Sequence, residues 1–331
     1  MTAPAAAEPL SPLRMGVIGA TSWIATRAVL PAIVASPATR LVSVASRDPI
    51  AGDEVAARFA AERSAPDYEG LLGDPDIEAV YIPLPNGLHR EWTERAAAAG
   101  RHVLCEKPLA PSAHDARAMA AACRAAGVVL MEAYMTPFHP RAPLVGELMT
   151  RGVLGRPRFA RAEFAFPLTD PSNHRWRPEM GGGALLDVGI YCLSPLVEIG
   201  GEPAEAAARA VVAGSGVDAS FSGWLAFADG FTATFACSFE APERQLLEVT
   251  GTGASVTVDW PFAGGAAGTR PRVTHLDGRT EEVAGPDGDP YLGMVEHFAA
   301  AVRGRADLRR PPAASVALLE LIDRLRQAAC R

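Results

Sequence analysis

The sequence contains almost no lysine. Of its 31 Lys and Arg residues only Lys107 is a lysine, and the other 30 are arginine. The composition is rich in Ala, Arg, Gly and Pro, as expected of a GC-rich gene, and this bias favours arginine wherever either cation serves. Arginine is planar and bulky, whereas lysine carries a compact, rotatable ammonium group whose pKa shifts readily. We therefore expect Lys107 either to serve a site that needs an ammonium group or to be a surface lysine left by chance.

Cysteine is also scarce. The five cysteines are odd in number, scattered along the chain and without the spacing of metal ligands; they are Cys105, Cys123, Cys192, Cys237 and Cys330. We expect reduced thiols in a cytoplasmic protein, with no disulfide framework and no metal site.

Further absences exclude other classes of protein. No run of roughly 18 apolar residues predicts a membrane span. Residues 1–13 lack the charged and apolar regions of a signal peptide, so we expect a flexible tail there. The formal charge is −7 and the pI is about 5.6, which disfavours nucleic-acid binding because that activity normally needs a basic surface.

What is present predicts two domains. The chain has 331 residues, of which 49% are hydrophobic, enough for two cores. Up to about residue 135, short apolar segments alternate with amphipathic helical segments. We expect strands at 14–20, 41–47, 77–85, 102–108 and 128–134, with helices at 24–36, 53–63, 89–100 and 113–127. Continuous apolar strands between helices indicate a parallel sheet covered on both faces. We therefore predict a Rossmann-type α/β domain over 14–135, with ligands beyond the carboxyl ends of its strands.

The first strand-to-helix turn resembles a dinucleotide-binding loop. Its sequence VIGATSWIA keeps one glycine of the G-x-G-x-x-G/A pattern, Gly19, and ends in Ala25. The loop follows a strand and opens a helix, whose N-terminal N–H groups suit a pyrophosphate. The candidate cofactor contacts are Gly19, Ala20, Thr21, Ser22, Trp23 and Ile24. The alternative is an ordinary tight turn.

The end of the second strand favours NADP(H) over NAD(H). An NAD enzyme usually places an acidic group there to bind the ribose 2′-OH. Here Ser46 and Arg47 occupy the position, and a hydroxyl and a guanidinium suit a 2′-phosphate. Asp48 follows directly and is the argument for NAD(H), and Arg47 could also be a solvated surface residue.

From about residue 136 the pattern changes to period-two alternation. We expect a helix at 139–152, then alternating strand segments at 156–166, 219–229, 231–239, 246–260 and 271–277, broken by turns at ADG (228–230) and GTG (251–253). A loop at 261–271 and helices at 291–304 and 314–329 complete the pattern. This predicts an α+β domain over 136–331 with a large, mostly antiparallel open sheet, whose C-terminal helices could pack back on the first domain. Its uncovered sheet face is a candidate subunit interface.

A glycine-rich segment between the halves carries the second group of candidate residues. Gly181 to Gly183 allow a close turn before a helix that we expect to begin near Ala184. Asp187 lies in its first turn, and Tyr191 lies four residues later on the same face. Both side chains could reach one substrate carbonyl. The alternatives are a helix-capping charge and a half-buried aromatic residue.

These motifs together resemble the Gfo/Idh/MocA oxidoreductases, the relatives of glucose-fructose oxidoreductase and inositol dehydrogenase. The resemblance extends over nearly the whole chain through GVIGATSWIA, VASRD, IPLPNGLH, CEKPLA, MEAYMTPFHP and GGGALLDVGIYCL. It implies that Lys107 is a catalytic lysine that bonds the substrate near the nicotinamide. Glu106 and Pro108 would shape its loop, with a cis bond before the proline. The remaining implied contacts are Pro85, Asn86, His89, Glu106, Lys107 and Trp176 for the cofactor, and Lys107, Tyr134, His139, Arg175, Asp187 and Tyr191 for the substrate.

The resemblance also implies an activity. Tyr191 stands where inositol dehydrogenases carry a histidine, which favours the branch that contains glucose-fructose oxidoreductase, dihydrodiol and xylose dehydrogenases, and sugar 3-ketoreductases. Within this branch the chain resembles the nucleotide-sugar 3-ketoreductases most, through FHPRAPLVGELM and RPEMGGGALLDVGIYC. We expect an NADPH-dependent reductase of a keto group on a nucleotide-linked sugar, such as a dTDP-3,4-diketo-deoxysugar, with Lys107, Tyr191 and Asp187 as its catalytic residues. Arg141 departs from the glutamine expected after FHP, which leaves the sugar open.

Three alternatives stay open. The first is an NADP-dependent sugar or trans-dihydrodiol dehydrogenase, the second an NAD-dependent glycosidase of similar architecture. The third is a non-catalytic, NADP-sensing regulator, which would be expected to lack Lys107 or Tyr191. In every case we expect a small-molecule ligand, no nucleic acid and no membrane, and a homodimer or homotetramer formed through the C-terminal sheet.

Overall fold

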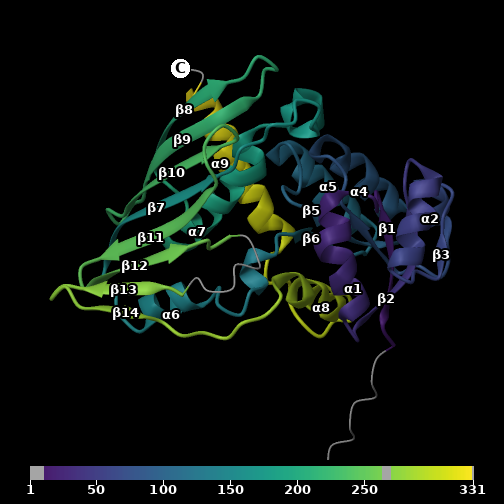
Figure 1. The fold of residues 1–331 in the computed structure, drawn as a ribbon, viewed down its shortest axis with the longest axis horizontal. Coiled ribbons are helices and arrows are strands. Elements are labelled where there is room, and N and C mark those ends of the chain that lie inside the picture. Colours follow the sequence, from purple (N-terminus) through teal and green to yellow (C-terminus); the bar gives the residue numbers. More distant parts are fainter. Residues whose placement is uncertain (1–10, 263–269, 330–331) are drawn as a thin grey trace, which may run out of the picture.

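The computed structural model describes residues 11–262 and 270–329, which form two sheets joined by a shared layer of helices (Figure 1). Most of the expected tail, residues 1–10, and Cys330 lie outside the described residues, as does most of the expected loop at 261–271. The tail prediction was too long by one residue, because Leu13 already belongs to the first strand and is fully buried.

The first sheet is parallel throughout and has the strand order β3-β2-β1-β4-β5-β6. Its strands are β1 (Leu13–Ile18), β2 (Thr39–Ala45), β3 (Arg63–Ser64), β4 (Ala79–Ile82), β5 (His102–Glu106) and β6 (Leu130–Ala133). All four residues of β4 are buried, as a strand covered on both faces requires. The predicted Rossmann-type sheet is confirmed.

The helices of this half follow their strands as expected. They are η1 (Ala25–Val29), α1 (Leu30–Ala35), α2 (Pro49–Arg58), α3 (Tyr68–Gly73), η2 (Asn86–Leu88), α4 (His89–Ala98) and α5 (Ala113–Ala125). Side chains cap three of them, because Asp48, Asp67 and Ser112 each accept from backbone N–H groups at a helix start. The predicted first helix opens with a π-helical turn, η1, which periodicity did not reveal.

The second sheet has eight strands in the order β14-β13-β12-β11-β7-β10-β9-β8. These are β7 (Pro157–Ala165), β8 (Glu205–Val212), β9 (Asp218–Ala226), β10 (Thr232–Ser238), β11 (Arg244–Gly251), β12 (Ala254–Asp259), β13 (Arg272–His275) and β14 (Thr280–Glu282). Every pair is antiparallel except β7 with β10, so the expected mostly antiparallel sheet is confirmed. The stretch 246–260 forms two antiparallel strands, β11 and β12, on either side of the GTG segment, where a turn was expected. Strands β8 and β14 were not predicted.

The helices of the second half pack between the two sheets (Figure 1). They are η3 (Thr136–Phe138), α6 (Leu144–Thr150), η4 (His174–Trp176), η5 (Pro178–Met180), η6 (Leu185–Gly189), α7 (Ile190–Gly200), α8 (Pro290–Val302) and α9 (Pro312–Ala329). Helix α8 lies against α1, and α9 lies against both α5 and β8. Buried residues of both halves form one continuous core, so the C-terminal helices tie the halves together.

The longest apolar helical stretch, Pro178–Gly200, has a mean hydropathy of 1.4 and could span a membrane by length and composition alone. Within the protein 78% of that window is buried, as in a core helix, so the stretch is weak evidence for a membrane.

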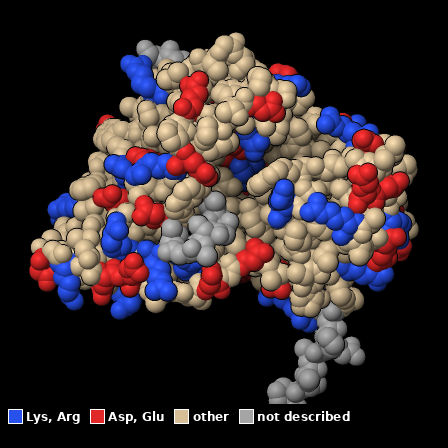
Figure 2. Space-filling model, viewed as in Figure 1, with Lys and Arg blue, Asp and Glu red and all other residues tan. Residues whose placement is uncertain are grey.

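Figure 2 shows acidic and basic side chains interspersed on one face, with a hollow where the two halves meet.

Candidate active site

The candidate cofactor loop lies at the carboxyl ends of β1 and β2, on the edge where doubly wound sheets bind ligands. Gly19 has a φ of +70°, and a Cβ there would lie 2.5 Å from Leu84 Cδ2, so the turn requires glycine. Thr21 Oγ1 and Ser46 Oγ lie 3.2 Å apart, which brings the first two loops together. Ser22 Oγ accepts from Ala25 N at 3.2 Å at the start of the helix.

The charged groups after β2 have separate tasks. The Asp48 carboxylate caps α2 by accepting from Ile50 N at 3.0 Å and from Ala51 N. Arg47 is exposed and, in the described ranges 11–262 and 270–329, forms no ion pair. One oxygen of the acidic group, Asp48 Oδ1, thus caps a helix, and an exposed guanidinium stands beside it.

These residues fit a phosphate-bearing dinucleotide. A close turn, two hydroxyls, a helix start without an acidic side chain in its first turn, and an exposed guanidinium meet at one edge. Ala20 is a correction, because its side chain is fully buried and its N–H donates to Ala45 O, so it shapes the loop from within.

Lys107 follows β5 and points across to the second half of the molecule. Its Nζ donates to Asp187 O at 2.7 Å and to Asp187 Oδ1 at 2.9 Å. An ammonium group has three N–H donors, and the third has no partner among the described residues. The peptide bond between Lys107 and Pro108 is cis, as the resemblance implied. Lys107 is thus held firmly while one donor stays available for a ligand.

Asp187 is held between two cations. Besides Lys107, Arg175 Nε donates to Asp187 Oδ2 at 2.7 Å. These two cations hold the pKa of Asp187 well below its usual range, against the opposing effect of burial. The carboxylate therefore stays ionised and acts as an anchor rather than as a proton donor at neutral pH.

The glycine run explains how this helix starts so close to other elements. Gly183 has a φ of +110°, and a Cβ there would lie 2.2 Å from Asp218 Oδ1. Asp218 uses its other oxygen, Oδ2, to accept from Leu185 N at 2.6 Å. The first turn, η6, is π-helical rather than α-helical, but it still directs both Asp187 and Tyr191 toward Lys107.

Tyr191 lies directly beneath the ammonium group. Lys107 Nζ is 4.8 Å from the centroid of the Tyr191 ring. The Tyr191 hydroxyl makes only a weak contact, donating to Met135 Sδ at 3.7 Å. Burial raises the pKa of Tyr191 well above its ordinary value, so the phenol is a neutral donor at physiological pH. The structure therefore brings together the amine and the phenol that the sequence placed 84 positions apart.

Glu106 supports the lysine from below. Tyr81 donates its hydroxyl to Glu106 Oε1 at 2.6 Å, and Lys107 N donates to Glu106 Oε2 at 3.1 Å. Burial raises the pKa of Glu106 to about 7. This carboxyl group shapes the Lys107 loop, as expected.

Three predicted cofactor contacts have different positions. His89 is fully buried, with Nδ1 3.0 Å from Pro108 O and Nε2 2.8 Å from Leu84 O, which contradicts direct contact with a cofactor. Asn86 Nδ2 donates to Gly181 O at 2.8 Å and so joins the two halves. Trp176 is half-buried edge-on against Phe239 of the second sheet. The sequence motifs locate these residues in the chain, but they do not predict which way the side chains point.

His174 is a site residue that sequence analysis missed. It lies in η4 next to Arg175, and the charges of Asp187 and Lys107 both act on the pKa of its imidazole. Burial and Arg175 lower the pKa of His174 to about 4, so the ring is neutral at pH 7. The only signal in the sequence was its position beside Arg175.

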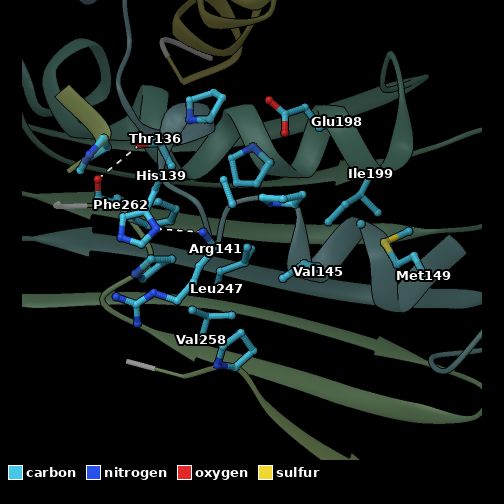
Figure 3. A pocket seen from close by; sticks show the side chains of 18 of the residues that line it. Thr136, His139, Arg141, Val145, Met149, Glu198, Ile199, Leu247, Val258 and Phe262 are labelled. Carbon is cyan, nitrogen blue, oxygen red and sulfur yellow. Dashed lines mark hydrogen bonds between the residues drawn. The ribbon is translucent and has the colours of Figure 1, made fainter. Parts of the chain in front are cut away.

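A cavity of about 450 Å³ lies next to Tyr191 (Figure 3). Its walls are largely apolar and include Leu247, Val258 and Ile199, with the polar groups of His139, Arg141 and Glu198 among them. Lys107, Asp187 and Tyr191 do not line it. Two lining rings, Tyr134 and Phe262, have centroids 5.2 and 6.1 Å from that of Tyr191. The predicted substrate residues Tyr134 and His139 therefore belong to a space adjoining the lysine cluster.

No group of three or more His, Cys, Asp or Glu side chains in the described part of the chain could hold a metal ion. The four described cysteines are buried free thiols.

Comparison with known proteins identifies the family. Residues 13–134 match the family described as "Oxidoreductase family, NAD-binding Rossmann fold", and residues 144–257 match the "GFO/IDH/MocA C-terminal domain". The chain belongs to the Gfo/Idh/MocA oxidoreductase family.

Relatives of two kinds match nearly the full length. A D-xylose 1-dehydrogenase (NADP(+)) from Haloferax volcanii is 35% identical, over 96% of this chain and 97% of the relative. A dTDP-3,4-didehydro-2,6-dideoxy-alpha-D-glucose 3-reductase from Saccharopolyspora spinosa is also 35% identical, over 92% and 91%. Among solved structures, a 3-ketoreductase from Actinomadura kijaniata in complex with NADP and TDP-benzene superposes with a TM-score of 0.90 at 31% identity, covering 96% of this chain and 98% of that one.

Proposed function

We propose that this protein uses NADPH to reduce a keto group on a nucleotide-linked sugar, such as a dTDP-3,4-diketo-deoxysugar. The observation that carries the proposal is the cluster in which Lys107 keeps one free N–H above the Tyr191 ring and beside the cofactor edge. The similarity to dTDP-sugar 3-reductases and to a 3-ketoreductase structure with NADP and TDP-benzene supports this substrate class.

The cofactor is NADP(H). The free Arg47 and the hydroxyl of Ser46 suit a 2′-phosphate, while Asp48 is committed to capping α2. NADPH, when bound, supplies the hydride that reduces the carbonyl carbon. The turn at Gly19 and the start of the first helix would hold its pyrophosphate.

The catalytic groups stabilise charge and supply a proton. As the carbonyl is reduced, negative charge develops on its oxygen, and the free N–H of Lys107 can donate to it. Tyr191, kept neutral by burial, donates the proton that completes the alcohol. The Lys107 ammonium over its ring stabilises the phenolate that this transfer leaves behind. Asp187 fixes the lysine and does not itself exchange protons.

Binding groups surround this centre. Arg175 and the neutral imidazole of His174 lie beside Asp187 and can bond sugar hydroxyls. The cavity bounded by Tyr134 and Phe262 can accept the part of the substrate remote from the carbonyl. The Arg141 side chain at this cavity donates to Asp287 Oδ1 at 3.0 Å.

A second candidate is an NADP-dependent sugar dehydrogenase that works in the oxidative direction. The D-xylose dehydrogenase similarity, over 96% of this chain, favours it. The same residues would serve, because a proton donor in reduction is the acceptor in oxidation. Initial rates with dTDP-linked ketosugars and NADPH, compared with D-xylose and NADP⁺, distinguish the two. Faster turnover of the free sugar would favour the dehydrogenase.

Substitution of Lys107 tests the proposal. Lys107→Ala is expected to lower kcat by roughly 10²–10³-fold or more, the scale of losing a preorganised donor at a developing oxyanion. Lys107→Arg should fail similarly, since a planar guanidinium cannot replace an ammonium packed between Asp187 and a ring face. NADPH binding, measured by fluorescence titration, should persist in both variants. Wild-type turnover in Lys107→Arg would contradict the role given to Lys107.

We also propose a homodimer or homotetramer formed through the outer face of the second sheet. Phe159, Val211 and Trp224 alternate onto the same face by strand register and are 53%, 59% and 38% exposed. Light scattering would test this, and a monomer would refute it.

The free thiols fit a reducing cytoplasm, where the enzyme would serve deoxysugar and antibiotic biosynthesis.

A further inference from the structure

A buried ion pair lies behind the Lys107 cluster and takes no part in the chemistry proposed above. Glu132 belongs to β6, and Arg310 lies just before α9, 178 positions later. Arg310 Nε donates to Glu132 Oε2 at 2.6 Å, and the two side chains are only 7% and 1% exposed. A buried ion pair is weak evidence for stability, because apolar side chains of the same volume often serve as well or better. The pair therefore invites another explanation.

The carboxylate holds the loop that carries Lys107. Glu132 Oε1 accepts from Leu109 N at 2.8 Å, two residues beyond the lysine. On the other side of Pro108, Lys107 N donates to Glu106 Oε2. The loop is thus fixed at both ends by carboxylates, and Glu132 provides one end.

The guanidinium holds the side of the site that carries Tyr191. Arg310 stacks over the ring of Tyr134, 4.7 Å from its centroid, and that ring packs against Tyr191. Arg310 NH1 also donates to Ser194 Oγ at 3.0 Å, one helical turn beyond Tyr191 on α7. One side chain therefore contacts both the helix that bears Tyr191 and the ring that supports it.

We propose that Glu132 and Arg310 form a positioning pair that holds the amine of Lys107 and the phenol of Tyr191 at a fixed position relative to each other. The pair joins the Leu109 backbone of the first half to the Tyr134 ring and to Ser194 on α7 of the second half. Neither member lines the cavity near Tyr191. The inference rests on the proposed function in assuming that Lys107 and Tyr191 perform the chemistry.

Arg310→Lys tests the pair with its charge retained. A lysine loses the planar fork that reaches Glu132, Ser194 and the Tyr134 face together. Misplacement of catalytic groups by about 1 Å can cost roughly 10²-fold, so kcat should fall by about 10- to 100-fold. The KM for the ketosugar and the dissociation constant of NADPH should change little, because both side chains are buried and neither lines the cavity near Tyr191.

Arg303→Lys is the matched control. Arg303 also binds a glutamate through two bonds, NH1 to Glu78 Oε1 at 2.8 Å and NH2 to Glu78 Oε2 at 3.0 Å. Glu78 directly precedes β4, so this pair lies at the amino end of that strand, away from the loops that follow the strands. It should keep wild-type kcat. If both variants lose kcat equally, or if Arg310→Lys loses it only in proportion to its unfolded fraction, the pair is merely structural and the proposal is wrong.

Hydrogen exchange gives a readout that does not depend on turnover. In Arg310→Lys and in Glu132→Gln, the peptide containing Leu109 should exchange its amide protons faster than in wild type, while peptides of β1 and β4 stay unchanged. Glu132→Gln replaces Arg310→Lys should the latter not fold. Faster exchange with no ketosugar activity even in wild type would count against the proposed function but support the positioning. Unchanged exchange at Leu109 would overturn the positioning itself.

Discussion

The two halves of the molecule contribute to the site in different ways. The parallel sheet presents loops, and its groups for the cofactor and the lysine follow β1, β2 and β5 at one edge. The second half presents one helix start, from which Asp187 and Tyr191 both project. Neither half alone holds Lys107, Tyr191 and the candidate cofactor loop. Substitutions at contacts between the halves should therefore damage activity most, and substitutions within one half should have narrower effects.

The contacts between the halves leave no space for extra atoms. A Cβ on Gly87 would lie 2.6 Å from Glu179 O, and one on Gly181 would lie 2.8 Å from Asn86 Cβ. Beside them, Asn86 bonds Gly181 O and Lys107 bonds Asp187. Backbone packing thus fixes the distance between the halves. The ion pair between Lys107 and Asp187 then fixes the proposed catalytic groups relative to each other.

The largest effect in this comparison is expected for Tyr191→Phe, which removes the phenol that the second half contributes. Loss of a positioned general acid should lower kcat by roughly 10²–10⁴-fold. Stability should change little, because the hydroxyl makes only a weak contact with Met135 Sδ. Steady-state kinetics and a thermal melt measure both effects on one preparation.

Tyr68→Phe provides the control for that change. Tyr68 packs edge-on against Trp92 within the first half and is not among the described contacts of the Lys107 ammonium group. It should keep wild-type kcat. Near-normal turnover in Tyr191→Phe would leave Lys107 as the sole proton source and remove the second half from the chemistry.

The sequence anticipated the first half better than the second because its signals are local. Apolar runs that end in Gly19, Ser46 and Lys107 predict parallel strands and the loops that follow them. The second half depends on long-range packing. Strand β8 has the sequence EAAARAVV, and its many alanines give little strand signal. The π-helical turn Leu185–Gly189 begins with a bond from Leu185 N to Asp218, a residue far along the chain.

Side-chain direction explains the remaining differences at the site. Lys107, Asp187 and Tyr191 were predicted together because each lies in a distinctive motif. His89 lies in such a motif too, but it turns inward to the carbonyls of Leu84 and Pro108. His174 has no motif and emerged only from its surroundings. No local pattern could have paired Glu132 with Arg310.

A narrower effect is expected for Arg47→Ala, because this change touches only the cofactor edge of the first half. Loss of one charge-assisted bond to a phosphate should raise the KM for NADPH by roughly 10- to 100-fold. The KM for NADH should hardly change, since NADH has no 2′-phosphate. Arg124→Ala, at the exposed end of α5, is the control and should alter neither constant. Equal effects on both cofactors would contradict the assignment of NADP(H).

The last effect concerns Glu106, which lies within the first half and acts on stability, through pH, rather than on a kinetic constant. Burial raises its pKa to about 7 in the folded protein, whereas an unfolded chain has a glutamate pKa of about 4.3. Between these values the folded state binds more protons than the unfolded state, so the free energy of unfolding falls as pH rises through this window. At about 1.4 kcal/mol per pKa unit, up to roughly 3 kcal/mol should be lost between pH 4.5 and pH 8.

Glu106→Gln should remove this slope while its amide oxygen still accepts from Tyr81. Urea titrations at pH 5, 6.5 and 8 measure the free energy of unfolding of both proteins. The variant should gain on wild type as pH rises, and Glu54→Gln, on the exposed surface of α2, should follow wild type at each pH. Parallel curves for wild type and Glu106→Gln would mean that Glu106 is ionised in the fold. The contrast between a support in the first half that titrates near pH 7 and the anchor Asp187 in the second, which stays ionised, would then be lost.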